Sequence, residues 1–446
     1  MESDILQTSQ EALTCLICRG IFMDPVLLRC DHNFCKACLI LSSEDIRIPD
    51  LCPECREPSP RMFINHITMK TLESTAREHR IMKYLSSEDH KCVIHRERKT
   101  KFCGKSSALL CQLCSDSQDH RGHRHCTIEL RVTKQMLKLE KQMASLLQKI
   151  QAQQKNVNAE RRTIRGWLDF LTLREEMIRS EYSKLYPPND EEENQQMEFM
   201  KNQSNTILDE LKKSEAMMVH KRSQLIELYQ ELKAMSQKPY EVLLLQDLDD
   251  LFRRSELVQL TQCMKPKLSV LPNTGLAARF NHFQVKIFFQ NLVLFDCQPR
   301  RFFNFRRLSF RPRNDIPFLD VPGSYRTSWG AESFTTGKYY WELDLKDHEQ
   351  WAVGVCYNFW LRNFDIGSEG AFLLVCLKDG DVYSLLTTCP SLHHYIEKPA
   401  GRVGVFLDCE GGYVSFLDVA KSSFIYSYCP GTFYYTVRPY YCTVCT

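Results

Sequence analysis

The sequence has no long apolar run and almost no excess of one charge. No stretch approaches the ~20 apolar residues that a membrane-spanning helix requires. The formal net charge is +3, so composition gives no reason to expect nucleic acid or an anionic membrane as the main partner. The N-terminal segment also lacks the basic residues and apolar core of a secretory signal. We therefore expect a cytoplasmic protein, with the nucleus as the alternative compartment.

Cysteine is absent from residues 127–262 and clustered before this gap. Of the 21 cysteines, seven lie in residues 15–55, five in residues 92–126 and nine from residue 263 onward. In a reducing compartment, clustered cysteines bind metal more often than they form disulfides. The length of 446 residues predicts two to four folding units, and the two clusters point to metal-binding units at the N-terminal end.

The first cluster contains seven cysteines and one histidine in four closely spaced pairs. The pairs are Cys15-x2-Cys18, Cys30-x-His32, Cys35-x2-Cys38 and Cys52-x2-Cys55. Two residues between paired ligands let both sulfur atoms reach one ion from a tight turn, and eight ligands suffice for two tetrahedral zinc ions. A disulfide knot and a redox pair are the alternatives, but a redox Cys-x-x-Cys expects a βαβ context that is absent here. The cluster therefore predicts two zinc sites.

The second cluster mixes cysteine and histidine at similar spacings. Its residues are Cys92-x2-His95, Cys103, Cys111-x2-Cys114 and His120-x2-His123. Thiolate sulfur and imidazole nitrogen are the ligands that zinc takes in structural sites. We expect this segment to bind one or two further zinc ions.

The first cluster matches the C3HC4 pattern of RING fingers, and the second resembles a type-2 B-box. The RING resemblance implies that one zinc is bound by Cys15, Cys18, Cys35 and Cys38, and the other by Cys30, His32, Cys52 and Cys55. The B-box resemblance implies one zinc on Cys92, His95, Cys111 and Cys114, and a second on Cys103, His120 and His123. The usual fourth ligand of that second site falls at Ser106, whose neutral hydroxyl is a poor zinc ligand. Water, Asp119, His125 or Cys126 then completes the site, or the site is empty.

RING fingers recruit a ubiquitin-conjugating enzyme charged with ubiquitin and form no covalent intermediate, so no covalent catalyst is expected in this chain. The resemblance implies that Ile17 and Pro53 make apolar contacts with that enzyme. It also places Arg56 where many RING fingers carry an arginine that bridges the enzyme and ubiquitin. Two positions depart from the pattern: Asp31 replaces a glycine, and Ala12 stands where related RING fingers often carry an acidic residue.

A heptad seam begins in the cysteine-free region. Its apolar residues are spaced by alternating steps of four and three: Val132, Met136, Leu139, Met143, Leu146 and Ile150. A single apolar stripe needs a partner helix, so we expect a coiled-coil dimer, with an intramolecular bundle as the alternative. Pro187 and Pro188 interrupt the pattern, because proline lacks an amide donor and disfavours helical geometry in the residue before it. We expect a kink or break near 187–188.

From about residue 280 the apolar period changes to two. Tyr339, Trp341, Leu343 and Leu345 share one face of a strand, while Asp379-Gly380 and Gly411-Gly412 mark hairpin turns. This pattern predicts an antiparallel β-sandwich. The order of its segments resembles a PRY–SPRY domain, which implies a module that binds a protein or peptide. Five aromatic residues are candidates for its binding face or its core: Phe302, Phe303, Phe305, Phe310 and Trp360.

Two further pairs in this part of the chain invite a metal interpretation. They are His393-His394 and Cys442-x2-Cys445. Neither pair has companions nearby in the sequence. We therefore expect surface imidazoles and ordinary thiols there, and no catalytic constellation is visible in this third of the chain.

The order of the modules resembles the tripartite-motif family of ubiquitin ligases, in its class with a C-terminal PRY–SPRY domain. We expect a multidomain protein with a RING finger at 1–80 (core 15–56), a B-box at 87–128, a long α-helical coiled coil at 129–265 and an antiparallel β-sandwich, the PRY–SPRY domain, at 270–446. The resemblance implies zinc as cofactor, a ubiquitin-conjugating enzyme and ubiquitin as partners, a protein substrate held by the PRY–SPRY domain, and an antiparallel homodimer. The alternative is a non-catalytic dimeric scaffold with an inactive RING. No membrane partner is expected, and the balanced charge argues against nucleic acid.

Overall fold

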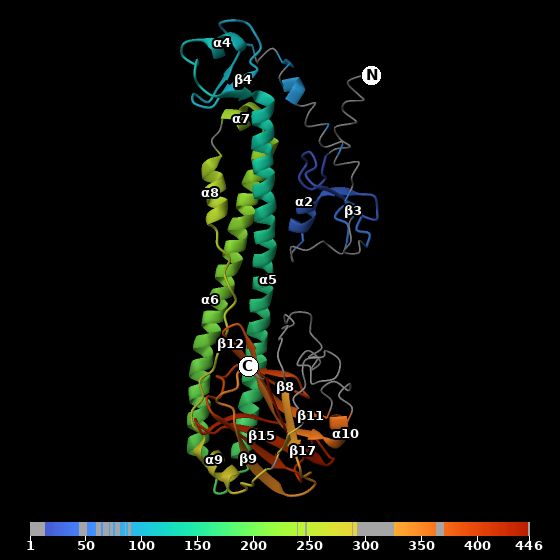
Figure 1. Ribbon diagram of the computed structural model, residues 1–446, viewed down its shortest axis with the longest axis vertical. Helices are drawn as coiled ribbons and strands as arrows, with labels where there is room; N and C mark the ends of the chain where they lie inside the picture. The colour runs from blue at the N-terminus through green and yellow to red at the C-terminus, as the bar shows by residue number, and fades with distance from the viewer. Residues whose placement is uncertain are drawn as a thin grey trace. The chain divides into compact units, whose positions relative to one another are not determined.

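The computed structural model of the chain is shown in Figure 1, which labels its elements. It describes residues 14–43, 51–58, 64–65, 71, 75, 81–84, 86–87, 91–238, 240–245, 248–287, 289–291, 325–362 and 370–444. The chain divides into two compact units, residues 1–158 with 215–263 and residues 159–214 with 264–446. The multidomain class predicted from the sequence is confirmed.

Each zinc-ligand cluster surrounds a small three-stranded antiparallel sheet with one short helix. The elements of the first are β1 (Pro25–Leu27), β2 (Asn33–Cys35), β3 (Ile64–Asn65) and α2 (Lys36–Leu41). The elements of the second are β4 (Lys101–Cys103), β5 (Ala108–Leu110), β6 (His125–Thr127) and α4 (Gln112–Asp116). Such short elements bury little apolar surface, so bound metal has to supply part of the folding free energy.

Two long helices make up the middle of the chain. Helix α5 (Ile128–Tyr182) ends before the Tyr186-Pro187-Pro188 segment, and α6 (Asp190–Gln237) begins after it. The heptad seam is buried against α6 of the same chain, for example Leu139, Leu146 and Ile150 against Leu225 and Leu232. This packing of α5 on α6 is the intramolecular arrangement that the sequence left as the alternative to a dimer. Among the described helices, none is long and apolar enough to cross a membrane.

Shorter helices follow the two long ones and lead into the C-terminal domain. They are α7 (Tyr240–Leu245), α8 (Asp249–Leu257) and α9 (Thr274–Asn281). Lys149 of α5 forms hydrogen bonds with the C-terminal end of α8. Its Nζ donates to the carbonyls of Ser255 at 3.0 Å and Glu256 at 3.2 Å. A cation at carbonyls near the end of a helix is electrostatically favourable, because these groups carry the negative end of the helix dipole.

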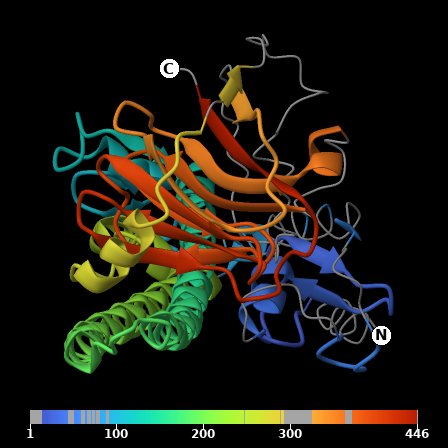
Figure 2. The same cartoon turned by 90° about the horizontal axis from the view of Figure 1, so that it is seen from below.

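The C-terminal domain is a sandwich of two antiparallel sheets, which lie face to face in Figure 2. The seven-stranded sheet has the order β13-β12-β11-β10-β17-β8-β7 and the four-stranded sheet the order β16-β15-β14-β9. The strands of the first are β7 (Phe289–Asn291), β8 (Tyr325–Gly330), β10 (Trp351–Tyr357), β11 (Ala371–Asp379), β12 (Val382–Thr387), β13 (Leu392–His394) and β17 (Val437–Val444). The strands of the second are β9 (Lys338–Asp344), β14 (Arg402–Asp408), β15 (Tyr413–Asp418) and β16 (Ser423–Ser427).

Strand β10 shows how alternation builds this domain. Val353 and Val355 point into the core between the sheets, whereas Ala352 and Cys356 belong to a second buried cluster on the opposite face. That second cluster is covered by α10 (Asn358–Arg362), whose Trp360 is 2% exposed. Trp360 is therefore a core residue and not part of a binding face. The other four candidate aromatics lie outside the described residues.

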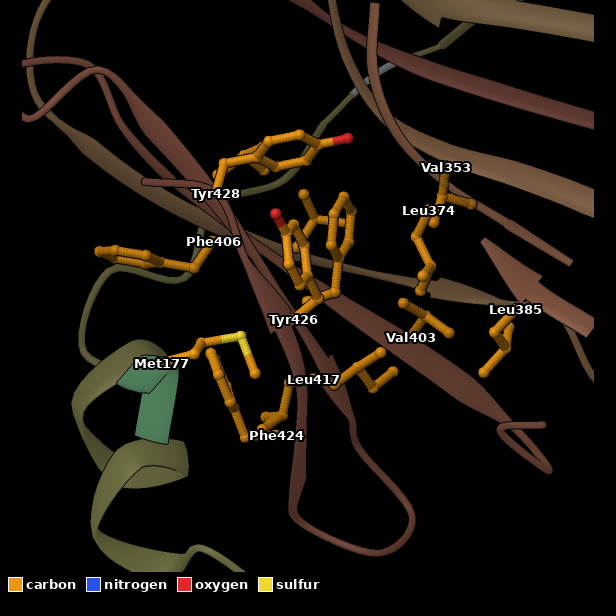
Figure 3. Packing of buried hydrophobic residues seen from close by; sticks show 14 of the residues in the cluster. Met177, Val353, Leu374, Leu385, Val403, Phe406, Leu417, Phe424, Tyr426 and Tyr428 are labelled. Atoms are coloured by element: carbon orange, nitrogen blue, oxygen red, sulfur yellow. The ribbon is translucent and has the colours of Figure 1, made fainter. Parts of the chain in front are cut away.

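Helix α5 contributes to the core of the sandwich. Trp167, Phe170, Met177, Ile178 and Tyr182 recur at helical spacing on one face of α5 and are buried in the same cluster as the sheet residues. Figure 3 shows Met177 reaching from the helix toward Phe424 of β16. The sandwich therefore extends beyond the segment whose period of two marked it in the sequence.

Candidate metal centres and RING surface

The structure brings the eight ligands of the first cluster together in two groups. Each group gathers its donor atoms within 4.8 Å of one another: Cys15, Cys18, Cys35 and Cys38 in one, and Cys30, His32, Cys52 and Cys55 in the other. The groups interleave along the chain, because the first and third pairs form one and the second and fourth pairs form the other. Neighbouring pairs therefore belong to different sites, as the RING resemblance implied.

Two groups also form in the second cluster. One has four donors, Cys92, His95, Cys111 and Cys114, and the other has three, Cys103, His120 and His123. The Cys111 and Cys114 ligands lie at the start of α4, where the N–H of Cys114 donates to the sulfur of Cys111 at 3.4 Å. The three-donor group is built from the end of β4 and the 117–123 turn.

Distances between the donor atoms match those around a tetrahedral zinc ion. Zinc–sulfur bonds of about 2.3 Å and zinc–nitrogen bonds of about 2.05 Å put tetrahedral ligands about 3.8 Å (S···S) and about 3.6 Å (S···N) apart. The Sγ atoms of Cys92 and Cys114 are 3.7 Å apart, and Nδ1 of His95 is 3.3 to 3.6 Å from the three sulfur atoms of its group. The four groups therefore fit zinc binding.

Three ligand pairs share one turn geometry, which we call the zinc knuckle. The residue after the second ligand has a positive φ in each: Arg19 (53°), Arg56 (59°) and Arg96 (55°). In each, its N–H donates to the carbonyl of the first ligand at 2.7 to 2.9 Å. Sequence analysis missed this repeat, although the letters CLICRG, CPECRE and CVIHRE display it. The repeat places an arginine in left-handed geometry directly after each pair.

Hydrogen bonds to sulfur favour the thiolate form that binds zinc. The N–H of His95 lowers the pKa of Cys92 to about 6, and the hydroxyl of Ser106 lowers the pKa of Cys103 to about 5. In the RING, backbone N–H groups of Met23 and Glu54 donate to the sulfur atoms of Cys35 at 3.2 Å and Cys52 at 3.4 Å. Hydrogen bonds thus stabilise negative charge on the sulfur atoms of Cys92 and Cys103, whereas hydrogen bonds with neighbouring thiols, Cys15 first, raise the pKa of Cys35 and of Cys38.

The residues assigned to the RING surface by resemblance are accessible. Ile17 is 37% exposed, and Pro53 and Arg56 are also exposed. Asp31, in place of the usual glycine, adopts a φ of 62°, a conformation that aspartate tolerates better than most residues. Ala12 lies outside the described residues.

The histidine pair of the C-terminal domain divides between surface and core. His393 is exposed, but His394 is only 2% exposed, so the expectation of a surface imidazole was wrong for His394. Burial lowers the pKa of His394 to about 3, with the charges of His393 and Arg174 acting in the same direction. Neither histidine belongs to a metal-ligand group among the described residues. Cys442 is buried, and Cys445 lies outside those residues.

Comparison with known proteins identifies both ends of the chain. The family model of the C3HC4-type zinc finger, or RING finger, matches residues 15–55, and that of the SPRY domain matches residues 338–444. The chain thus has the architecture of a RING protein with a C-terminal SPRY domain.

Curated relatives match the chain over almost its whole length. The chain is 52% identical to tripartite motif-containing protein 43C and 51% identical to tripartite motif-containing protein 43B, both from Mus musculus, over 99% and 100% of both chains respectively. It is 39% identical to human tripartite motif-containing protein 51 over 99% of both chains. The chain therefore belongs to the tripartite motif-containing protein family. Its RING finger and its family support an activity of the ubiquitin-ligase type in general terms.

Proposed function

We propose that the protein is a RING-type ubiquitin ligase that activates a ubiquitin-charged conjugating enzyme for transfer to lysines of a bound protein. The observation that carries the proposal is the exposure of Ile17, Pro53 and Arg56 on the knuckles of a RING finger. Zinc, bound to the RING and B-box groups, supplies folding free energy and holds the loops in shape without redox chemistry.

Three side chains would act on the charged enzyme. Ile17 and Pro53 present apolar surface on turns whose backbone is fixed by ligands on either side. Arg56 follows Cys55 directly, so the same knuckle fixes its backbone. A guanidinium offers several N–H donors in a planar fork, which suits bridging carbonyls of the enzyme and of ubiquitin. Restricting the thioester-linked tail in this way favours attack by a lysine through proximity and orientation.

The remaining modules would choose the substrate and set the geometry of transfer. We propose that the SPRY domain binds the protein substrate and that the helical segment forms an antiparallel homodimer. Two substrate-binding domains in one assembly convert the second contact into an intramolecular event, which raises the apparent affinity. We propose the module limits 1–80, 87–128, 129–265 and 270–446 and a cytoplasmic location, with the nucleus as the alternative. The described cysteines form no disulfides with one another, which suits a reducing compartment.

The test is single-turnover discharge of ubiquitin from charged conjugating enzymes to free lysine, with the full-length protein. We expect the wild type to accelerate discharge, and Ile17→Ala and Arg56→Ala each to reduce that acceleration at least tenfold, which is about 1.4 kcal/mol of transition-state stabilisation. Each loses a contact without losing a zinc ligand, so the zinc content should not change.

The B-box knuckle provides matched controls. Ile94 and Arg96 occupy the positions of Ile17 and Arg19 in an equivalent knuckle, and Arg96 also shares the backbone geometry of Arg56. Ile94→Ala and Arg96→Ala should leave discharge unchanged. If the wild type, zinc-loaded and folded, accelerates no conjugating enzyme, the ligase proposal is wrong and the non-catalytic scaffold takes its place.

A further inference from the structure

We infer that the second metal site of the B-box has three protein ligands, Cys103, His120 and His123, and a fourth position open to water or a small anion. The inference depends on metal binding by these residues and not on the proposed ligase function. It concerns a segment, residues 91–127, that the structure describes without a gap.

The first observation is the size of the ligand group. The other three groups each gather four donors within 4.8 Å, whereas this one gathers three. No further cysteine, histidine, aspartate or glutamate within residues 91–127 joins it. A zinc ion with three protein ligands keeps a fourth position for an exogenous ligand.

Three residues in this segment, Ser106, Cys126 and Asp119, are candidates for the fourth ligand, and each is unsuitable. Ser106 carries a neutral hydroxyl, which is a poor zinc ligand. Cys126 pairs with Phe102 across β4 and β6, whereas Cys103 pairs with His125. Because successive residues of a strand point to opposite faces, Cys126 lies on the face away from Cys103. Asp119 is exposed and outside the group.

His125 supplies a second, independent observation. It lies on the same face as Cys103, and its ring centroid is 6.4 Å from that of His120, yet it is not in the ligand group. Its Nε2 is buried, and within the described part of the chain it has no hydrogen-bond partner. A buried polar atom without a partner is costly, so a bound water or anion beside the metal would satisfy it. His125 is thus placed to hold the exogenous ligand and not the metal.

The experiment is to load the full-length protein with Co²⁺ in place of zinc and to titrate it with azide. We expect four cobalt ions per chain and a saturable change in the cobalt visible absorption that corresponds to one azide per chain. The RING sites and the first B-box site have four protein ligands and serve as internal controls. Ser106→Cys, which supplies the fourth ligand, should abolish the azide response and slow removal of one cobalt by a chelator about tenfold or more, the scale on which ligand surroundings change metal affinity.

Further variants separate the alternatives. His123→Ala removes a ligand and should eliminate both the azide response and one cobalt ion, while Ser106→Asp provides a carboxylate ligand should the cysteine variant fail to fold. The inference is overturned by four bound cobalt ions without an azide response, because a protein group then fills the fourth position. It is equally overturned by three cobalt ions per chain, or by an azide response that persists in His123→Ala.

Discussion

Replacing Trp167 by alanine will lower the unfolding free energy of the C-terminal unit by about 3–5 kcal/mol, the usual cost of removing a large buried aromatic side chain. Trp167 lies on α5 and is 0% exposed. Its ring packs against Phe170 with centroids 5.9 Å apart and, edge to face, against Tyr395 of the sandwich at 5.6 Å. Alanine would leave a cavity between the helix and the sheet, and a close-packed core can relax only partly to fill it.

The measurement is urea unfolding followed by tryptophan fluorescence. All five tryptophans of the chain lie between residues 167 and 360, so this signal reports on the unit that contains the sandwich and not on the zinc modules. Leu168→Ala is the matched control, since Leu168 is the next residue on the same helix but is 44% exposed. It should cost no more than about 0.5 kcal/mol. Equal losses for the two variants would show that α5 is not part of the sandwich core.

The polar contacts at this junction explain why the helix is held in register with the sheet. Strand β16 is an edge strand, and its unpaired backbone groups meet α5. Arg174 donates from Nη1 to the carbonyl of Ile425 at 3.0 Å and from Nη2 to that of Phe424 at 2.9 Å. The N–H of Ser427 donates to the sulfur of Met177 at 3.2 Å. Covering the edge in this way removes a surface on which another strand could otherwise pair.

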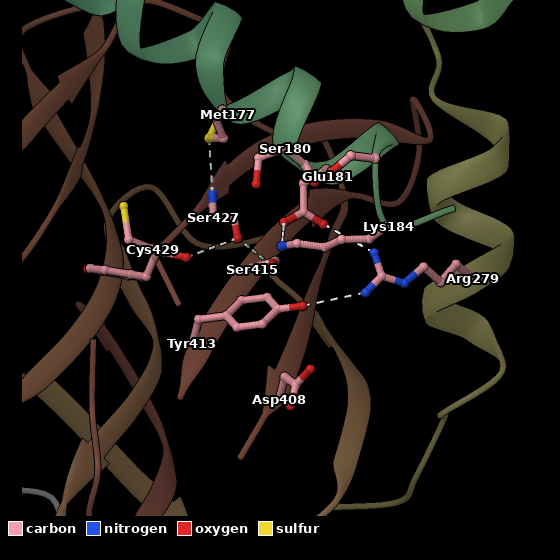
Figure 4. Close-up of polar contacts among 12 residues, drawn as sticks. Met177, Ser180, Glu181, Lys184, Arg279, Asp408, Tyr413, Ser415, Ser427 and Cys429 are labelled. Carbon is pink, nitrogen blue, oxygen red and sulfur yellow. Dashed lines mark hydrogen bonds and ion pairs between the residues drawn. The ribbon is translucent and has the colours of Figure 1, made fainter. Parts of the chain in front are cut away.

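A second set of contacts joins α5 to α9 and to β15 (Figure 4). Glu181 is only 1% exposed and pairs with Lys184 at 2.5 Å and with Arg279 at 3.4 Å. Arg279 also donates to the hydroxyl of Tyr413 at 3.4 Å, and Nζ of Lys184 lies 4.2 Å from the centroid of that ring. A buried carboxylate needs partners of this kind, because burying an unpaired charge is costly.

Sequence reasoning succeeded where the structure depends on local spacing. The paired zinc ligands are separated by one or two residues, and the heptad seam is a pattern along one helix, so both were predicted from the letters. It failed where the contact is distant: Arg174 and Ile425 are 251 positions apart. Periodicity indicates that one face of α5 is apolar, but it does not say whether a helix or a sheet covers that face. His394 was misread for the same reason, since its burial depends on residues far away in the sequence.

The buried His394 predicts an acid-sensitive C-terminal unit. Its folded pKa of about 3 lies below the usual histidine value of about 6.5 in an unfolded chain. Between these values the unfolded state binds a proton that the folded state does not, so stability falls as the pH decreases from 6.5 toward 3. The loss is about 1.4 kcal/mol per pH unit, or about 2.7 kcal/mol at pH 4.5.

Comparing His394→Gln with the wild type isolates this contribution. Glutamine does not titrate, so the variant should be less stable than the wild type at pH 7 and lose about 2.7 kcal/mol less between pH 8 and pH 4.5. Urea unfolding followed by tryptophan fluorescence again reports on the unit that contains the sandwich. His282→Gln is the matched control: this histidine belongs to the same unit and is exposed, and its substitution should leave the pH dependence unchanged. Identical pH dependence in the wild type and His394→Gln would contradict the prediction.

The environment of His394 links the two predictions. Its ring lies 4.8 Å from that of Tyr426 and 6.4 Å from that of Phe170, the residue that Trp167 packs against, and its Nε2 lies 3.2 Å from the hydroxyl of Thr387. Helix α5 therefore helps to exclude water from the imidazole, and it brings the cationic Arg174 that further disfavours protonation. Opening the junction with Trp167→Ala should hydrate His394 and bring its pKa closer to 6.5. The acid-induced loss of stability should then be smaller in Trp167→Ala than in the wild type, because part of the same contact has already been lost.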